Sequence, residues 1–297
     1  MIKTILLTTR PQFLLLSLSV VLLGTAIAFY QGAVWSTPLF VLILFGAVLS
    51  HAAVNMLNEY QDFRSGLDDM TDRTPFSGGS GALPNHPEAA PAVFRALVLV
   101  IGMLVILGVY FIKLKGWAIL PLGLVGLLVI LTYTSKITRH PWVCLIAPGL
   151  AFGPLMVLGT YFVWTGGFSW LALALSLLPF FLVNNLLLLN QIPDLVADKA
   201  VDRFNIIMKL GIKRSLTIFS VFTGLAFVTL VLAQLAFNLP NLVWLGLLGG
   251  LIALPMLKIS LNAAENVDKL MPALGMNVII NLLTPALVAV GLVWPLW

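Results

Sequence analysis

Residues 169–198 read SWLALALSLLPFFLVNNLLLLNQIPDLVAD, an apolar run that ends in polar and acidic residues. The apolar part, 169–190, has the length of about 20 residues that a helix needs to cross the ~30 Å hydrocarbon layer of a bilayer. Its hydrophobicity is continuous rather than alternating, which favours a membrane helix over a strand of a barrel. Carboxylates at the end of such a span are costly and usually functional. The stretch therefore indicates a membrane protein whose functional residues lie at the polar end of this span.

Runs of the same kind recur along the whole chain. Of its 297 residues, 60% are hydrophobic and 9% are charged. A soluble domain carries about 25% charged residues, so a water-soluble fold is excluded. The apolar runs fall near 11–31, 36–57, 92–112, 116–134, 142–163, 169–190, 214–237, 241–257 and 273–296. With no linker or break in composition, they predict an all-α polytopic membrane protein of one domain, 1–297, with about nine transmembrane helices around a central cavity.

The charged residues are distributed unequally between the two sides of the membrane. When the loops are assigned to alternate sides, 14 Lys and Arg residues fall on the side of the N-terminus, and 2, Lys113 and Lys115, fall on the other. The positive-inside rule makes the first side cytoplasmic. We expect the protein to reside in the cell membrane of a bacterium or an archaeon. All 11 acidic residues lie on this side too, so we expect the cavity and the active site to open there. The net charge of +5 follows from this topology and does not indicate nucleic-acid binding.

Acidic and amide residues on this side form two clusters with helical spacing. The first contains His51, Asn55, Asn58 and Asp62, and the second contains Asn190, Asp194, Asp198 and Asp202. Spacings of three or four residues place each set on one face of a continuing helix. Carboxylates stacked in this way repel one another unless cations offset them. Oxygen ligands from two helices suit Mg²⁺, which is usually held by one or two carboxylates and substrate phosphates. A solvated helix end could explain either cluster alone, but two matching clusters on one side favour a metal site.

The two clusters resemble those of the UbiA-type family of intramembrane prenyltransferases. Members carry an Asn/Asp-rich motif after the second of about nine helices and an Asp-x-x-x-Asp motif after the sixth. The resemblance covers most of the chain and includes Thr9-Arg10-Pro11 before the first span and Tyr133-Thr134-Ser135-Lys136 after the fourth. The segments similar to the branch that acts on 1,4-dihydroxy-2-naphthoate in menaquinone synthesis are Asn58-Glu59-Tyr60-Gln61-Asp62, Gly66-Leu67-Asp68, Gly78-Gly79-Ser80-Gly81, Gly153-Pro154 and Gly159-Thr160-Tyr161.

The second motif departs from that branch at three places. Pro193 stands where the branch has Arg, and Asp202-Arg203 and Asn205 stand where it has Gly-Lys followed by Thr. Pro193 is expected to break or kink the sixth helix just before Asp194. These changes keep the metal ligands but leave other acceptors of the family open, namely 4-hydroxybenzoate, homogentisate, chlorophyllide, haem and ether-lipid precursors.

The resemblance implies Mg²⁺-dependent transfer of a prenyl chain from a prenyl diphosphate to a small aromatic acceptor. The residues expected to bind the metal are Asn58, Asp62, Asp68, Asn190, Asp194 and Asp198. The residues expected to bind the diphosphate are Arg64, Lys136, Arg139, Lys199 and Arg203. The expected catalytic residues are Asp62, Asp194, His51 and Tyr133. Tyr133 would stabilise an allylic cation through its ring. His51 would line the acceptor pocket or accept the ring proton, and a histidine simply satisfied between helices is an equal alternative.

Two other classes of membrane protein also use intramembrane carboxylates. A cation-coupled transporter would place acids near helix centres or on both sides of the membrane, whereas here they lie on one side. A CDP-alcohol phosphatidyltransferase would carry an Asp-Gly…Ala-Arg segment leading into an Asp pair, and neither cluster has one. The loop 71–91, with its Gly78-Gly79-Ser80-Gly81 run, is expected to be a lid over the cavity or else a flexible connector.

The unequal charge distribution predicts where a reporter will be active. A reporter enzyme that works only after export, fused after Trp297, should be active because the C-terminus is expected outside the cell. The same reporter fused to a chain that stops after Lys209, on the predicted cytoplasmic side, is the control and should be inactive. If the first fusion is silent and a cytoplasm-specific reporter is active there instead, the nine-helix topology is wrong.

Overall fold

The structure, a computed structural model, describes residues 1–71, 73–201, 203–263 and 266–294. Within these ranges the chain forms helices joined by short connections, with no strand among them. A helix satisfies its backbone hydrogen bonds internally, which a segment surrounded by lipid must do. The predicted all-α class is confirmed.

Eight helices are long and apolar enough to cross a membrane. With the short turns that extend some of them, they cover Pro11–Tyr30, Thr37–Ser65, Pro87–Lys115, Pro141–Thr165, Trp170–Asn190, Ile212–Phe237, Asn241–Ala263 and Val267–Val293. They match eight of the nine expected runs. The remaining run, 116–134, forms a shorter apolar helix, Trp117–Thr132. The chain is an integral multi-pass membrane protein, in which the fourth predicted span is shorter than the others.

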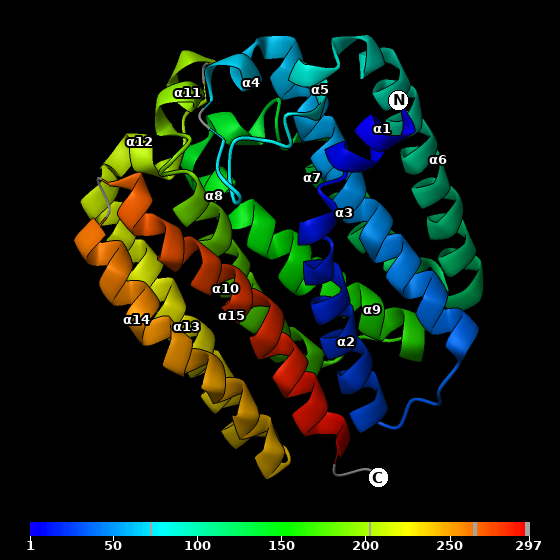
Figure 1. Cartoon of the computed structure of the whole chain (residues 1–297). Helices are drawn as coiled ribbons and strands as arrows, with labels where there is room; N and C mark the ends of the chain where they lie inside the picture. The colour runs from blue at the N-terminus through cyan, green and yellow to red at the C-terminus, as the bar shows by residue number, and fades with distance from the viewer. Residues whose placement is uncertain (72, 202, 264–265, 295–297) are drawn as a thin grey trace.

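The long helices run back and forth through one bundle (Figure 1). In chain order they are α2 (Leu15–Tyr30), α3 (Thr37–Ser65), α6 (Ala90–Lys115), α7 (Leu120–Thr132), α8 (Pro141–Leu150) with α9 (Met156–Thr165), α10 (Trp170–Asn190), α13 (Ile212–Phe237), α14 (Leu248–Ala263) and α15 (Val267–Val293). Short 3-10 or π-helical segments lie at their ends or between them, namely η1 (Pro11–Phe13), η2 (Pro87–Ala89), η3 (Trp117–Ile119), η4 (Ile137–Arg139), η5 (Ala151–Leu155) and η6 (Asn241–Leu247).

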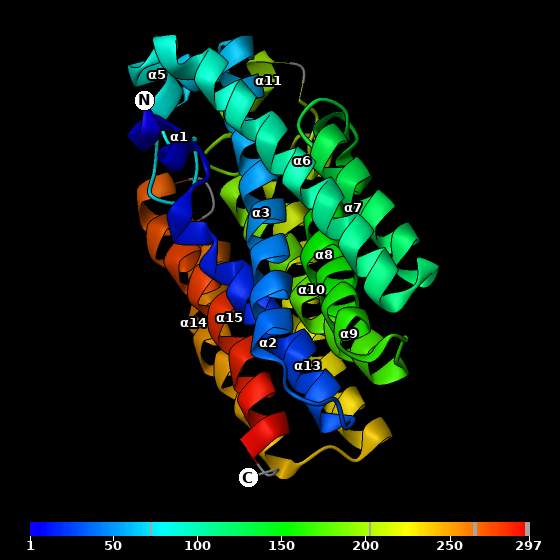
Figure 2. The same cartoon turned by 90° about the vertical axis from the view of Figure 1, so that its right-hand side faces the viewer.

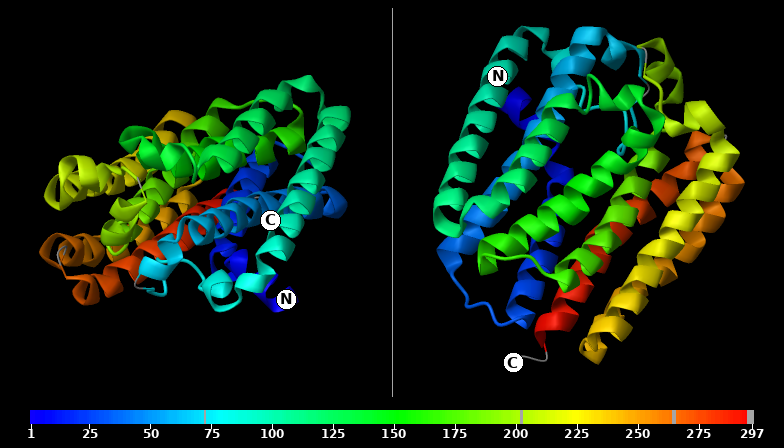
Figure 3. Two further views of the ribbon diagram at one scale, coloured as in Figure 1. Left: turned by 90° about the horizontal axis from the view of Figure 1, so that it is seen from above. Right: turned by 180° about the vertical axis from the view of Figure 1, so that it is seen from behind.

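The helices differ in how deeply they are buried within the protein. In α10, 67% of the apolar segment is buried, and in α6 only 11%. α10 packs against α8, α13 and α15, and α2 packs between α15, α9 and α3. Figure 3 shows α6 at one side of the bundle and α13 with α14 at the other. The centre of the fold is therefore α2, α10 and α15, while most of α6 faces the surroundings.

Short helices gather at one end of the bundle, which we term the polar end (Figures 1 and 2). They are α1 (Ile2–Thr8), α4 (Leu67–Met70), α5 (Ala82–Asn85), α11 (Leu195–Ala200) and α12 (Ile206–Leu210). Both predicted clusters lie at this end, because α3 and α10 both end there. α15 ends at the opposite end of the bundle.

A close contact fixes α8 and η5 against α10. The Gly149 N–H donates to Asn184 Oδ1 at 2.6 Å, and a Cβ on Gly149 would lie 2.1 Å from the carbonyl oxygen of Phe180. Pro148 and Pro154 remove backbone donors from this stretch, and η5, which contains Pro154, is a π-helical turn. Such turns are common at functional sites. Here the turn forms part of a cavity wall described below.

Candidate active site at the polar end

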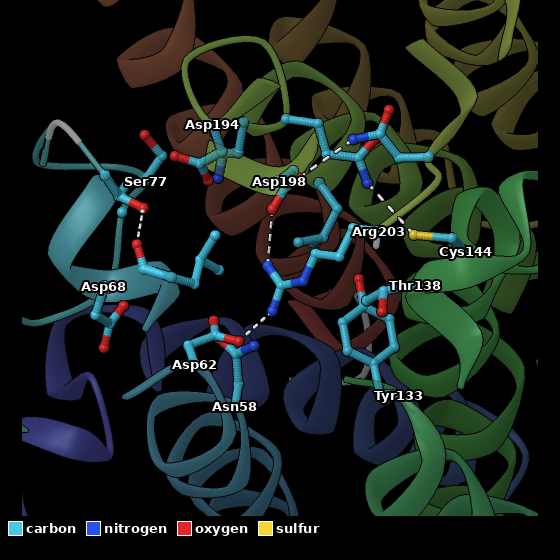
Figure 4. A pocket seen from close by; sticks show the side chains of 18 of the residues that line it. Asn58, Asp62, Asp68, Ser77, Tyr133, Thr138, Cys144, Asp194, Asp198 and Arg203 are labelled. Atoms are coloured by element: carbon cyan, nitrogen blue, oxygen red, sulfur yellow. Dashed lines mark hydrogen bonds and ion pairs between the residues drawn. The ribbon is translucent and has the colours of Figure 1, made fainter. Parts of the chain in front are cut away.

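A pocket of about 110 Å³ lies among the short helices of the polar end (Figure 4). We term it the polar pocket. Its walls come from the end of α3, from α4, from the segment 76–79, from the residues after α7 and from the segment 187–205. Four carboxylates line it, namely Asp62, Asp68, Asp194 and Asp198. The fold thus brings together acids from two parts of the chain that are far apart in the sequence.

The first cluster reaches the pocket because α3 continues beyond its apolar run. The helix extends to Ser65, and Gly66, in the left-handed conformation at φ 75°, ends it. Asn58 and Asp62, one turn apart on α3, both line the polar pocket, and Asp68 reaches it from α4. α3 is continuous through this cluster, so its residues share one face of a helix as their spacing predicted.

The second cluster is not one continuous helix, contrary to the prediction. α10 ends at Asn190, a turn follows, and Asp194 is the N-cap residue of α11. Pro193 lies in that turn, as expected for a residue that lacks the N–H a helix interior needs. Asn190, Asp194 and Asp198 nevertheless all line the polar pocket. Asp202 lies outside the described residues.

An arginine joins the two clusters. Arg203 Nη1 donates to Asp198 Oδ1 at 2.9 Å, and its Nη2 donates to Asp62 Oδ1, so that Arg203 lies between the two acids in Figure 4. Asn205 donates to the other oxygen of Asp198 at 3.3 Å, while its own side-chain oxygen caps α12. Asp62 and Asp198 are each 5% exposed, so water and salt screen these ion pairs weakly. Arg203 thereby offsets the repulsion between the two clusters.

The other two carboxyl groups of the pocket bind protons more readily than usual. Burial, followed by the negative charges of Glu59 and Asp62, raises the pKa of Asp68 to about 7. Burial, followed by the negative charge of Asp198, raises the pKa of Asp194 to about 6. A cation that binds these carboxylates would therefore displace protons near neutral pH.

Several oxygen atoms in the pocket fit a hard cation. In the described part of the chain, Asp68 Oδ2, Asn190 Oδ1 and Asp194 Oδ1 are buried and accept no hydrogen bond. Oxygen ligands of this kind suit Mg²⁺. No three His, Cys, Asp or Glu side chains among the described residues are grouped so that they could hold a metal ion. The donors therefore fit Mg²⁺ that takes its remaining ligands from phosphate and water.

Of the five basic residues expected to bind diphosphate, Arg203 lines the polar pocket. Arg64, Lys136, Arg139 and Lys199 are exposed and are not among the lining residues. Their sequence positions at one end of the helices agree with the alternative that such residues anchor the topology at the membrane surface. The structure does not bring these four into the site.

Arg10 lines the pocket, although the sequence patterns did not single it out as a site residue. It donates to Glu59 Oε1 at 2.7 Å and to Asn58 Oδ1 at 3.3 Å. Its φ of 51° is uncommon for a residue other than glycine. The following Pro11 disfavours a helical conformation at this position, so Arg10 turns between α1 and η1. The Arg-Pro pair was the signal in the sequence that could have identified this arginine.

Glu59 anchors the glycine-rich loop to the pocket. Its carboxylate is fully buried and accepts hydrogen bonds from the Ser80 N–H at 2.7 Å and from Ser80 Oγ at 2.6 Å. Gly79 has φ 75°, and a Cβ there would lie 3.0 Å from Asp68 Oδ1, so glycine is required where the loop meets the acids. The loop thus forms one wall of the pocket, and its opening as a lid stays a prediction.

A larger cavity of about 550 Å³ adjoins the polar pocket, lined mainly by apolar residues of α3, α6, α7, η5 and α9. We term it the apolar cavity. Six residues line both spaces, namely Arg10, Asn58, Phe76, Tyr133, Leu187 and Asn190. The two spaces are therefore neighbours that share part of their walls, with a charged compartment at the polar end and an apolar one within the bundle.

Two of the expected catalytic residues lie in these walls. Tyr133, directly after α7, lines both the polar pocket and the apolar cavity. His51 lines only the apolar cavity, where its Nδ1 lies 3.0 Å from Ser17 Oγ and its ring packs edge-on against Phe152 at 4.7 Å between centroids. His51 is therefore held between helices and is also part of the cavity wall.

Comparisons with known proteins agree with this architecture. The UbiA prenyltransferase family matches residues 17–279. Over 226 residues the chain is 29% identical to a 1,4-dihydroxy-2-naphthoate octaprenyltransferase of Bacillus subtilis (strain 168), covering 75% of this chain and 71% of that protein. The apo structure of a UbiA homolog from Aeropyrum pernix K1 matches with a TM-score of 0.74 at 16% identity, covering 96% of this chain and 98% of that one. A UbiA homolog from Archaeoglobus fulgidus bound to DMAPP and Mg²⁺ matches with a TM-score of 0.60 at 14% identity, covering 97% and 99%. At these identities the two structures establish a shared fold.

Replacing Glu59 should release the glycine-rich loop. Glu59→Ala removes the acceptor of Ser80 and leaves the partly buried Arg10 without its carboxylate. Breaking a buried ion pair from one side costs on the order of 3 kcal/mol, so the protein should unfold at a lower temperature and a protease should cut the loop faster. Glu88→Ala is the matched control, because Glu88 pairs with His86 at an exposed site. Equal stability and equal cleavage of the two variants would contradict the anchoring role.

Proposed function

The chain belongs to the UbiA prenyltransferase family, and we propose that this prenyltransferase transfers the chain of a prenyl diphosphate to 1,4-dihydroxy-2-naphthoate with the help of Mg²⁺. The observation that carries the proposal is that the polar pocket and the apolar cavity lie side by side and share six lining residues. A molecule with a charged head and an apolar tail fits both at once. The acceptor is supported by the motifs similar to that branch and by the name of the Bacillus subtilis relative.

The carboxylates and amides of the polar pocket are proposed to hold the metal ion. They are Asn58, Asp62, Asp68, Asn190, Asp194 and Asp198. Bound Mg²⁺ supplies electrostatic stabilisation of the charge that develops on the departing diphosphate. Arg203 and Arg10 line the same pocket and would donate hydrogen bonds to diphosphate oxygens. For this, Arg203 has to give up at least one of its two carboxylate partners.

The reacting carbon is proposed to lie at the boundary of the two spaces. The bond between the allylic carbon and the diphosphate oxygen breaks, and its electron pair leaves with the diphosphate. Tyr133 lines both spaces, so its ring can stabilise the positive charge left on the prenyl group. A carbon of the acceptor ring then forms the new bond. Where that carbon carries hydrogen, the proton is lost, and His51 in the cavity wall is the proposed acceptor. Where it carries the carboxylate of 1,4-dihydroxy-2-naphthoate, carbon dioxide leaves instead, and the electron pair of the broken bond restores the aromatic ring.

The distribution of charge along the sequence supports an active site on the cytoplasmic side of the cell membrane. Both acidic clusters belong to the side that carries 14 of the 16 Lys and Arg residues. Prenyl diphosphates carry several negative charges and do not cross a bilayer unaided. A pocket that opens to the cytoplasm would receive them from solution.

A transfer assay tests the proposed function. Purified protein with labelled geranylgeranyl diphosphate and Mg²⁺ should prenylate 1,4-dihydroxy-2-naphthoate in preference to 4-hydroxybenzoate and homogentisate. Removal of divalent ions by a chelator should abolish the product, and Mg²⁺ should restore it. Preference for another aromatic acceptor would correct the branch, and full turnover after chelation would exclude the metal role of the carboxylates.

Single replacements in the polar pocket should abolish transfer. Asp62→Ala and Asp194→Ala each remove a carboxylate of one cluster and should lower kcat by about 10²–10³. The double variant should lose little more than either single one, because residues that act as one unit are not additive. Asp268→Ala, at the exposed start of α15, is the control and should keep normal turnover. If either pocket variant keeps more than about a tenth of wild-type activity, the two-cluster mechanism is wrong.

A further inference from the structure

We propose that Ser17 and His51 form a hydrogen-bonded pair that binds a hydroxyl group of the aromatic acceptor inside the apolar cavity. The inference rests on the proposed function, because it assumes an aromatic acceptor that reacts at the boundary of the two spaces. It gives His51 a task that does not depend on a proton leaving the ring, and it makes Ser17 a positioning residue. The pair would select acceptors that carry a hydroxyl on the far side of the reacting ring.

His51 is a buried polar side chain with one free ring nitrogen. Its Nδ1 lies 3.0 Å from Ser17 Oγ, and Ser17 and His51 are 0% and 7% exposed. In the described part of the chain, Nε2 of His51 has no hydrogen-bond partner. Buried polar groups are nearly always hydrogen-bonded. Since His51 lines the apolar cavity, the partner of Nε2 has to come from a molecule in that cavity.

The contact with Ser17 determines which ligands the free nitrogen can bind. A neutral imidazole has one nitrogen that donates a hydrogen bond and one that accepts. If Nδ1 donates to Ser17, Nε2 accepts, and if Ser17 donates to Nδ1, Nε2 donates. A hydroxyl group fits both arrangements because it can donate and accept, whereas a carboxylate fits only the second. The pair is therefore better suited to a hydroxyl than to a carboxylate.

Two neighbours hold the ring of His51 in place. Ser17 lies on α2, which packs against α3, the helix that carries His51. Phe152, in the π-helical turn η5, packs against the imidazole with the ring centroids 4.7 Å apart and the ring planes at 77°. Phe152 also lines the cavity. The imidazole is thus fixed by residues from two other elements, which a group needs if it is to select a substrate.

Three other polar residues of the cavity wall are tied to the backbone. Ser50 Oγ donates to a carbonyl oxygen of the preceding helical turn at 2.8 Å, and Asn55 Nδ2 donates to the carbonyl oxygen of Thr9 at 2.9 Å. Asn281 Nδ2 donates to two backbone carbonyls. Compared with these residues, His51 alone has a side-chain nitrogen without a partner among the described residues.

The depth of His51 suits an acceptor that reacts at the boundary of the two spaces. His51 precedes Asn58 by seven residues on α3, so it lies about 10 Å farther from the polar end along the helix axis. A contact of about 3 Å at either end leaves the width of one aromatic ring between them. In 1,4-dihydroxy-2-naphthoate, the 4-hydroxyl lies across the ring from the 1-hydroxyl and the carboxylate. With the carboxylate at the boundary, the 4-hydroxyl would point to His51.

An acceptor without this hydroxyl tests the pair. The measurement is kcat/KM for 1,4-dihydroxy-2-naphthoate divided by kcat/KM for 1-hydroxy-2-naphthoate, with one prenyl diphosphate and Mg²⁺. The two acceptors differ only in the 4-hydroxyl, and their difference in intrinsic reactivity is the same for every variant. His51→Leu should lower the ratio by about fivefold, and Ser17→Ala by about threefold, because each weakens the hydrogen bond to that hydroxyl.

Ser50→Ala is the matched control. Ser50 also lines the cavity from α3, but its hydroxyl donates to the backbone, so the ratio should stay at the wild-type value. The double variant Ser17→Ala/His51→Leu should have the ratio of His51→Leu, because Ser17 acts through the histidine. A merely structural role of either residue would lower turnover of both acceptors, or the unfolding temperature, without changing the ratio.

The proposal is wrong if the ratio in both variants equals that in Ser50→Ala. If His51→Leu does not fold, as judged by gel filtration and thermal unfolding, Ser17→Ala decides alone. Failure of the proposed function would look different, because the wild-type protein would then prenylate neither naphthoate, and this inference would be overturned with it.

Discussion

The guanidinium of Arg203 lies between two acids, Asp62 on α3 and Asp198 on α11, and donates to both. Without it, the negative charges of these two carboxylates would repel each other across the pocket. Both carboxylates are buried, so their repulsion is reduced little by water. Two helices that bring ionised acids to one pocket are destabilised by their repulsion, and a cation between those acids offsets it. In the proposed function these carboxylates would hold a metal ion together with a substrate phosphate, and Arg203 would then be free to donate to that phosphate. Without substrate, Arg203 offsets the repulsion between the carboxylates, and with substrate bound the metal ion would do so.

The second positive charge at the pocket follows the same pattern. Arg10 pairs with Glu59, which is fully buried and also fixes Ser80 of the glycine-rich loop. Arg10 comes from the segment that precedes α2 and Arg203 from the segment between α10 and α13, while the first cluster comes from α3 itself. The acids on the helix therefore position the connecting segments around them. Replacing one member of such a network affects a loop wall as well as a charge, because the remaining partner stays buried.

The sequence predicted those features that depend on local spacing. The stripe of Asn58 and Asp62 follows from helical periodicity, and Pro193 marked the break after α10. Spacing alone failed for the second cluster, because a proline turn replaced the continuous helix while leaving the acids at the pocket. Spacing also failed to tell which basic residues line the polar pocket, because a sequence pattern treats Lys136 and Arg203 as equal candidates. Only the tertiary structure decides that Arg203 meets Asp62, which is far away in the sequence, while Lys136 stays exposed.

The position of the site at the boundary between two environments follows from the cost of burying charge. Several carboxylates deep in the apolar part of the bundle would be prohibitively unfavourable, whereas at the polar end Arg203 donates to two of them and offsets part of their charge. The apolar cavity has the opposite requirement, since it can hold a hydrocarbon chain only where water is excluded. α3 and α10 both line the two spaces, with Asn58 and Asn190 at the junction. In a prenyl diphosphate, the allylic carbon is the atom at which the charged head meets the apolar tail. The residues that line both spaces, Tyr133 and Asn190 among them, are therefore the ones beside which the proposed bond cleavage would occur.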